Sequence, residues 1–346
     1  MDTVVYLATD EGVVTLRRKS DGSLEEVGRG PKGWAVQGIA VDPATPNRIL
    51  AGTRGDGVWV SEDFGTSWTK PCYGKRGPGK VRCVTIDPHN PNRVYAGGEP
   101  IDVFVSEDMC KTWQRMDSPW EVPFVSTVTY PGTGVEPHVR DITVSPTDPD
   151  TIYIALQVGY MLKTTDGGET WKLLNENLDC DVHTIVIDPK NSDKVMVATG
   201  GGDSRKHLTS GRALYLSQDG GSSWNGTAMQ IEQEYSVPLA MHPTNPDVLF
   251  SAVAHGNPNM WRGEAGADSH MIRTRDGGAT WQAVDRGREN MSRRYPEGIA
   301  FDEGHPDRMF TGYRTGEIFV SEDAGDSWSL SSASVTHIAD MRAVPA

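Results

Sequence analysis

Cysteine is scarce in this 346-residue chain, which contains only four. Four cysteines are too few for a disulfide framework in a protein of this length, so we expect reduced thiols. One question stays open, because Cys72 and Cys83 flank a single loop and could pair. No run of 18 apolar residues occurs, so the sequence predicts no transmembrane helix. The N-terminal stretch MDTVVYLATDEG lacks the features of a secretory signal. We therefore expect a cytoplasmic protein, or a secreted or periplasmic one if a signal peptide has been removed.

Positive charge is also scarce, with 33 Lys and Arg against 47 Asp and Glu and a formal net charge of -14. Nucleic acids and anionic membranes are bound by clustered Lys and Arg, so we expect neither as a partner. The spacings H-x-x-x-H and C-x-x-C are absent, and no cofactor or metal is predicted. A divalent metal held by histidines is the alternative.

Glycine and proline, by contrast, are abundant, with 38 and 22 residues, and the turns that they mark are repeated. The octet S/T-x-D-x-G-x-S/T-W occurs six times, starting at residues 61, 106, 164, 217, 274 and 321. In the second copy Cys110 replaces the glycine, and we expect that turn to be distorted. An Asp-Pro type of turn alternates with the octets, as in VDPATPNRILAG (41–52) and IDPHNPNRVYAG (86–97).

Each repeat unit predicts four short strands, which we name A to D in chain order. Strand A precedes the Asp-Pro turn, strand B follows it, strand C leads into the octet, and strand D starts at its Trp. Four strands in a period of 45 to 58 residues are typical of a propeller blade. The sequence therefore predicts an all-β, seven-bladed β-propeller of four-stranded antiparallel blades in a single domain, 1–346. Six blades are expected at 35–72, 80–118, 138–178, 181–230, 235–287 and 296–331, and the last blade is closed by the N- and C-terminal strands, 1–30 and 335–346.

The octets resemble the Asp-box, or BNR, repeat. That repeat is shared by sialidases, xyloglucanase-type glycoside hydrolases, the sortilin luminal domain and the photosystem II assembly factor. The resemblance covers nearly the whole chain and implies a propeller, but it does not choose between enzyme and binding scaffold. The F/Y-R-I-P motif of sialidases is missing, so classical sialidase activity is disfavoured. Xyloglucanase-type enzymes pair two such propellers, and this chain supplies one.

The octets themselves are expected to be structural, because they lie one per blade around the rim and their carboxylates cannot converge. The octet Asp and Ser/Thr can accept hydrogen bonds from backbone N–H groups, and the Trp can pack between blades. The A–B and C–D turns belong to one face of a propeller, and the longer, irregular loops belong to the other. We therefore expect the functional site on the loop-rich face, at the mouth of the central channel.

Aligning the seven A strands gives one largely polar column at the expected mouth. Its members are Gln37, Arg82, Arg140, His183, Val237, Glu297 and Thr336. Arg82 and Arg140 could bind a carboxylate or a phosphate, and Gln37 could assist them. The equal alternative is that both arginines only form salt bridges between blades. The candidates for proton transfer are His183, Glu297 and Asp141.

Further substrate contacts are expected from loops and strand entries of the same face. These residues are Trp120, Trp261, Tyr313, Arg314 and His337. Aromatic rings there could stack on a flat ligand or simply pin their own loops. Basic loop residues, among them Arg293 and Arg294, should attract an anion.

The sequence thus predicts a single-propeller hydrolase or lyase acting on a small anionic or carbohydrate-like substrate. The alternative is a non-catalytic binding or assembly scaffold that uses the same face for a protein partner. The sequence does not choose an oligomeric state.

Overall fold

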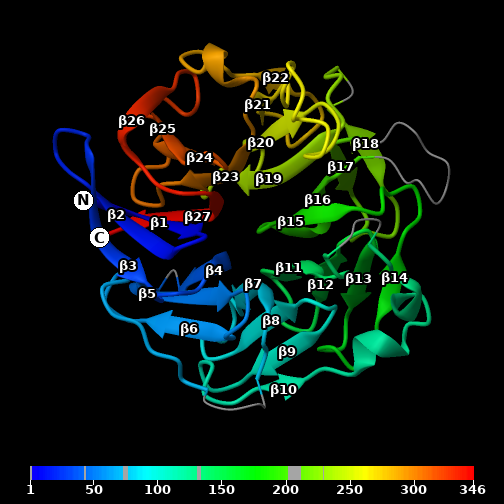
Figure 1. Cartoon of the computed structure of the whole chain (residues 1–346). Helices are drawn as coiled ribbons and strands as arrows, with labels where there is room; N and C mark the ends of the chain where they lie inside the picture. The colour runs from blue at the N-terminus through cyan, green and yellow to red at the C-terminus, as the bar shows by residue number, and fades with distance from the viewer. Residues whose placement is uncertain (1, 43, 73–76, 131–133, 202–211, 229) are drawn as a thin grey trace.

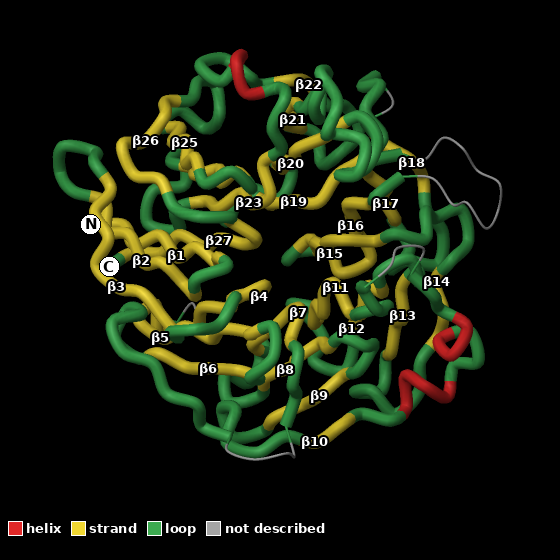
Figure 2. The backbone as a smooth tube through the Cα atoms, viewed as in Figure 1, coloured by secondary structure: helices red, strands yellow, loops and turns green. Residues whose placement is uncertain are grey.

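Seven antiparallel sheets form a ring around a central channel in this computed structural model (Figure 1). The structure describes all residues except 1, 43, 73–76, 131–133, 202–211 and 229. The arrangement confirms the predicted all-β, seven-bladed propeller. Helix in the described residues is confined to short 3-10 segments such as η1 (Ser118–Glu121), η2 (Val125–Thr127) and η4 (Glu289–Met291), drawn red in Figure 2. None of the described helices has the length and apolar character needed to span a membrane.

Each blade runs outward from an inner strand beside the channel. The strands, blade by blade from the inside, are β27 (Ile338–Pro345), β1 (Thr3–Thr9), β2 (Gly12–Arg18) and β3 (Leu24–Gly30); β4 (Val36–Asp42), β5 (Thr45–Thr53) and β6 (Val58–Ser61); β7 (Val81–Ile86), β8 (Val94–Gly98), β9 (Val103–Ser106) and β10 (Gln114–Arg115); β11 (Val139–Val144), β12 (Ile152–Leu156), β13 (Met161–Thr164) and β14 (Lys172–Leu174); β15 (Val182–Asp188), β16 (Asn191–Thr199), β17 (Leu214–Ser217) and β18 (Asn225–Thr227); β19 (Tyr235–Met241), β20 (Leu249–Ala254), β21 (His270–Thr274) and β22 (Gln282–Ala283); and β23 (Pro296–Phe301), β24 (Met309–Tyr313), β25 (Glu317–Ser321) and β26 (Ser329–Ser334).

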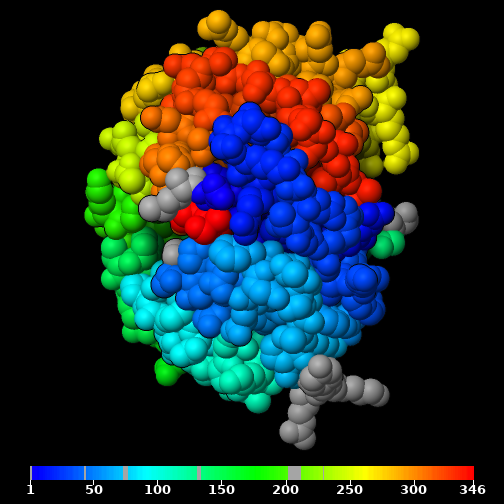
Figure 3. Space-filling model, turned by 90° about the vertical axis from the view of Figure 1, so that its left-hand side faces the viewer, coloured from blue at the N-terminus to red at the C-terminus, as the bar shows by residue number. Residues whose placement is uncertain are grey.

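The two ends of the chain close the ring, as the sequence predicts. Strand β27 pairs antiparallel with β1 from Thr3 opposite Pro345 to Thr9 opposite Ile338. The blue N-terminal strands and the red C-terminal strand accordingly lie side by side in Figure 3. This pairing gives the inner edge of β1 a partner that would otherwise be missing.

One blade has a reduced outer edge. The sheet of β4, β5 and β6 has three strands, and the position of its fourth is marked by a single bridge between Val60 and Thr69. Pro71, two residues after Thr69, has no backbone N–H to extend the pairing.

The Asp boxes form closed hydrogen-bond networks within their own turns. In the box that ends at Trp171, Asp166 Oδ1 accepts from the Thr164 hydroxyl at 2.6 Å and from the Thr170 backbone N–H at 2.9 Å. The Thr164 hydroxyl in turn accepts from the Gly168 N–H at 3.0 Å. The hydrogen bond from Thr164, followed by those from Thr170, lowers the pKa of Asp166 to about 2.

The boxes and the Asp-Pro turns lie on the same face, as expected. In each of six blades a backbone N–H of the box donates to a carbonyl of the A–B turn. The pairs are Phe64 to Asn47, Met109 to Asn92, Gly167 to Asp150, Gly220 to Asp193, Gly277 to Asp247 and Ala324 to Asp307, at 2.8 to 3.0 Å. These bonds tie the two recurring motifs together and leave the other ends of the blades to the longer loops.

The box of the second copy corrects an expectation. Cys110 occupies the glycine position, yet its N–H still donates to Ser106 Oγ at 2.9 Å, and Asp108 still accepts from the Thr112 N–H at 2.8 Å. Cys110 simply adopts a φ of 65°, so the predicted distortion is wrong. The network around the residue outweighs the cost of about 1–2 kcal/mol for a left-handed conformation. All four cysteines are free, so Cys72 and Cys83 do not pair.

Each box also packs against the preceding blade, and Gly325 shows how closely. A Cβ atom placed on Gly325 would lie 2.3 Å from the ring of Phe250, which is fully buried in the neighbouring blade. Gly33 has a nearly identical φ, 82° against 81°, but a Cβ there would meet nothing within 4 Å.

We therefore expect Gly325→Ala to destabilise the protein more than Gly33→Ala. Both substitutions place an alanine in a left-handed conformation, which lowers the free energy of unfolding by a similar amount. Gly325→Ala alone adds a clash with a rigid buried ring, which lowers it by about 1–3 kcal/mol more. Urea unfolding of the two variants measures the difference. Equal free energies of unfolding would show that the box does not depend on this inter-blade contact.

Candidate functional site at the channel mouth

The central channel is a cavity of about 750 Å³ lined by the inner strands of all seven blades. Its walls are formed by β27, β4, β7, β11, β15, β19 and β23, which Figure 1 shows meeting around the axis. Such a volume is in the range of small-molecule sites.

Every inner strand carries a register shift at the same level. The residues skipped by the pairing are Gln37, Arg82, Arg140, His183, Val237 with Pro238, Glu297 and Ala339. All of them line the channel. A β-bulge re-aims a side chain out of the normal alternation, so one position in each blade is turned toward the mouth.

At six of these seven positions the structure has the residue predicted for the polar column. At the seventh the prediction is wrong. In β27 the bulged residue is Ala339, whereas Thr336 precedes the strand. The predicted position, Thr336, is three residues before the bulge at Ala339. The other six A strands were aligned on the Asp-Pro turn that follows them, and no such turn follows this strand. His337 accordingly lies at the rim, where its Nδ1 is 3.1 Å from Asp10 Oδ2.

Arg82 is committed to an internal salt bridge. Its Nε donates to Glu99 Oε2 at 2.6 Å, and its Nη1 donates to Gln37 Oε1 at 3.2 Å. The side chains of Arg82 and Glu99 are both buried. The salt-bridge alternative therefore describes Arg82, and Gln37 is part of the same network.

Arg140 is different. Within the described part of the chain its guanidinium forms no hydrogen bond or ion pair, and its Nε is buried without a partner. Leaving a buried donor unsatisfied costs about 1–3 kcal/mol, more for a charged group. The channel thus contains one cation that lacks an acceptor.

His183 is buried and bonded at both ring nitrogens. Its Nδ1 lies 2.6 Å from the carbonyl oxygen of Ser236, which can only accept, so Nδ1 carries the proton. Its Nε2 lies 3.3 Å from Asp181 Oδ2. Burial opposes ionisation of Asp181, but the charge and hydrogen bond of His183 outweigh it and hold the pKa of Asp181 below its usual value.

Glu297 forms an ion pair with Arg314, so these two predicted residues are brought together at the mouth. Tyr313, in contrast, is fully buried and its hydroxyl accepts from Arg288 Nε at 2.7 Å. Tyr313 is therefore part of the core of its blade in this conformation and offers no surface to a ligand.

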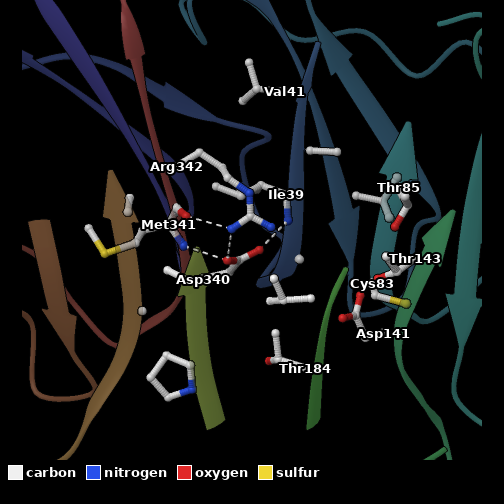
Figure 4. A pocket seen from close by; sticks show the side chains of 18 of the residues that line it. Ile39, Val41, Cys83, Thr85, Asp141, Thr143, Thr184, Asp340, Met341 and Arg342 are labelled. Atoms are coloured by element: carbon white, nitrogen blue, oxygen red, sulfur yellow. Dashed lines mark hydrogen bonds and ion pairs between the residues drawn. The ribbon is translucent and has the colours of Figure 1, made fainter. Parts of the chain in front are cut away.

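Asp141 and Asp340 occupy equivalent positions, one residue after the bulge, in blades far apart along the ring. Asp141 Oδ2 accepts from the Ile185 N–H at 2.8 Å, and Asp340 Oδ2 accepts from the Ile39 N–H at 3.1 Å, in each case on the inner strand of the next blade. Both face the channel, and Arg342 folds over Asp340 (Figure 4). Burial raises the pKa of Asp141 to about 6, against the opposing effect of the Ile185 hydrogen bond.

The two predicted tryptophans are in different surroundings. Trp261 packs against Tyr235 and Tyr295, with ring centroids 5.3 and 4.8 Å apart, and Tyr235 reaches His183 at 5.3 Å. Trp261 therefore belongs to an aromatic group behind the mouth. Trp120 lies in η1 and is not among the residues that line the channel.

Neutral His138 also lies near the two arginines. Burial, together with the charges of Arg82 and Arg140, lowers the pKa of His138 to about 3. Among the described residues no group of three His, Cys, Asp or Glu side chains is placed to hold a metal ion. Sequence reasoning missed Asp340 and Arg342 because of the alignment error in β27, and it missed Glu99 because nothing in a loop glutamate signals its partner.

Comparison with known proteins is consistent with this architecture. The family model described as sortilin, neurotensin receptor 3, matches residues 159–295. No curated protein sequence matches the chain. An ancestral GH74 enzyme superimposes with a TM-score of 0.60 at 19% identity, covering 82% of this chain and 36% of the enzyme. The chain thus spans about a third of that enzyme.

A second kind of neighbour matches over most of its length. YCF48 from Cyanidioschyzon merolae gives a TM-score of 0.57 at 14% identity, covering 88% of this chain and 86% of that one. YCF48 bound to D1 peptide gives 0.56 at 14% identity, covering 87% and 83%. The chain is a seven-bladed β-propeller. It is consistent with the Asp-box-like superfamily, and the likenesses point to no specific member.

The raised pKa of Asp141 makes a prediction about stability. The folded state retains a proton between the ordinary pKa of 3.8 and about 6, so the free energy of unfolding should fall as the pH rises through this window. Asp141→Asn keeps an oxygen for the Ile185 N–H and removes the titration. We expect the variant to gain on the order of 3 kcal/mol over the wild type between pH 4 and pH 7.

Denaturant unfolding across this pH range measures the effect. Asp117→Asn, at an exposed carboxylate on the rim, is the matched control and should follow the wild type. A constant difference between Asp141→Asn and wild type at all pH values would refute the buried, proton-retaining carboxyl.

Proposed function

We propose that this propeller binds an anionic ligand at the channel mouth, with Arg140 as the group that receives the negative charge. The observation that carries this proposal is the buried Nε of Arg140, which has no partner among the described residues. A carboxylate placed there would accept from the guanidinium fork in bidentate fashion.

The contrast between the two arginines supports the proposal. Arg82 and Arg140 occupy the same bulge position in adjacent blades, but Glu99 neutralises Arg82 at 2.6 Å. No described carboxylate accepts a hydrogen bond from Arg140, although its charge helps to lower the pKa of Asp181 nearby. The neighbouring histidine, His138, is neutral and does not neutralise Arg140.

The bonding of the candidate catalysts favours binding over turnover. His183 is held by Ser236 and Asp181, and Glu297 is held by Arg314. A general acid or base needs a free position toward the substrate. The YCF48 likeness adds support, because that protein has a structure bound to D1 peptide and matches this chain over most of both lengths.

A second candidate function is hydrolysis of a carbohydrate-like substrate, and one observation favours it. Asp141 retains its proton up to about pH 6 and shares the channel with Asp340. Two carboxyl groups with separated roles are the machinery of glycoside hydrolysis, and a GH74 enzyme is among the neighbours by fold. If this is the function, the rate on aryl glycosides should fall above pH 6 and Asp141→Asn should abolish it. A rate that survives in Asp141→Asn would remove this candidate.

For the anion site, we expect butyrate to bind the wild type and to shift the Nε–Hε NMR signal of Arg140. Arg140→Gln should weaken butyrate binding about 10- to 100-fold, because a charge-assisted hydrogen bond contributes about 1.5–3 kcal/mol. Arg140→Lys should retain part of the affinity, since it keeps the charge and loses the fork.

Arg275→Gln is the matched control, because Arg275 is an exposed arginine of an Asp box on the opposite face. It should leave the affinity unchanged. Unaltered butyrate binding in Arg140→Gln would contradict the assignment.

A further inference from the structure

A second cavity adjoins the mouth on the side of Arg82. Its volume is about 350 Å³, and its charged lining consists of Arg54, Lys80, Arg82 and Glu99. Arg82 lines both this cavity and the channel, so the two are adjacent on either side of its side chain.

The charge in this cavity is unbalanced. Three cationic side chains surround one carboxylate, which leaves two positive charges in a chain with a net charge of -14. Glu99 Oε2 accepts a hydrogen bond from Arg82 Nε at 2.6 Å. Lys80 Nζ is more distant, at 3.6 Å from Glu99 Oε1. The Arg54 guanidinium forms no ion pair or hydrogen bond with any residue that the structure describes.

Main-chain contacts fix the positions of these residues, while the side chains of Arg54 and Lys80 are exposed. Arg54 and Lys80 are joined by an antiparallel bridge between two blades. The Arg54 N–H donates to the Ala35 carbonyl at 2.9 Å, and the Glu99 N–H donates to the Lys80 carbonyl at 3.1 Å. The cationic side chains repel one another, Glu99 is the carboxylate that pairs with them among the described residues, and an external anion relieves the remaining repulsion.

Arg54, Arg82 and Arg140 form a row from the cavity into the channel. Arg82 lines the second cavity together with Arg54 and the channel together with Arg140, and Glu99 neutralises its charge. Within this row, Arg54 and Arg140 form no hydrogen bond or ion pair with a described residue, and the Nε of Arg140 is also buried. A ligand with one anionic group would satisfy only one end.

We propose that the ligand of the channel mouth is a dianion of the dicarboxylate class, with one carboxylate on Arg140 and the second on Arg54 and Lys80. This inference rests on the proposed anion site at Arg140 and extends it to a second subsite. The hydrocarbon between the two carboxylates passes Arg82, whose charge Glu99 already neutralises. Selectivity for a dicarboxylate over a monocarboxylate follows from the second pair of cations.

The test compares dicarboxylates from succinate to suberate with monocarboxylates of the same carbon number, by calorimetric or NMR titration of the full chain. We expect at least one dicarboxylate to bind tenfold or more tightly than its monocarboxylate. The double variant Arg54→Gln/Lys80→Gln should remove that advantage and leave monocarboxylate binding within twofold of the wild type.

The matched control is Lys111→Gln/Lys190→Gln, which removes the same charge from exposed turns on the opposite face. It should preserve the preference for the dicarboxylate. Equal binding of every dicarboxylate and its monocarboxylate would overturn the second subsite while the site at Arg140 stands. A dicarboxylate advantage that persists in Arg54→Gln/Lys80→Gln would also overturn it. Binding of neither class would remove the anion site itself, and the second subsite with it.

Discussion

The pairing of β27 with β1 is the interaction on which the rest of the structure depends. It joins residues more than 300 positions apart and completes the ring with a blade made from both ends of the chain. Closure places all seven inner strands around one axis at a common height. It also brings Asp340 and Arg342 into the channel, opposite strands from the middle of the sequence. Without it, the inner edge of β1 would be open and the channel would lose one wall.

Within the closed ring, the β-bulge of each inner strand directs side chains toward the channel mouth and so forms the candidate site. Each inner strand bulges at the same level, so each blade presents one residue to the mouth. The bulge recurs in every blade and the side chain at it differs: Gln, Arg, Arg, His, Val (followed by Pro), Glu and Ala follow one another around the ring. The Asp boxes and the Asp-Pro turns tie the strands together on the opposite face, and buried apolar clusters fill the blades. The residues at the mouth are thus largely separated from the turn motifs, and one of them, Arg140, has no acceptor among the residues that the structure describes.

Much of this was predictable from the sequence, for a definite physical reason. Turns require particular residues, so six Asp boxes and six Asp-Pro turns establish the blade count and the direction of every strand. Each Asp-Pro turn lies a constant distance from the bulge, which identifies six mouth residues. The seventh inner strand ends the chain without such a turn, and Ala339 was therefore missed in favour of Thr336. Which mouth residues form ion pairs was not predictable from the sequence. Arg82 lies in β7, and its partner Glu99 lies in the loop after β8, 17 residues away. Cys110 shows the same limit at a single residue, since the surrounding hydrogen bonds decide its conformation.

Ring closure and the bulges leave Arg140 at the mouth free to take an anion. A crystal structure of the protein soaked in bromide, with the ion located by anomalous scattering, would show whether it does. We expect a bromide ion within hydrogen-bond distance of Arg140 Nε, whereas Arg82, already paired with Glu99, should bind none. Bromide found only elsewhere on the protein, with Arg140 paired to a carboxylate of the chain, would contradict this expectation.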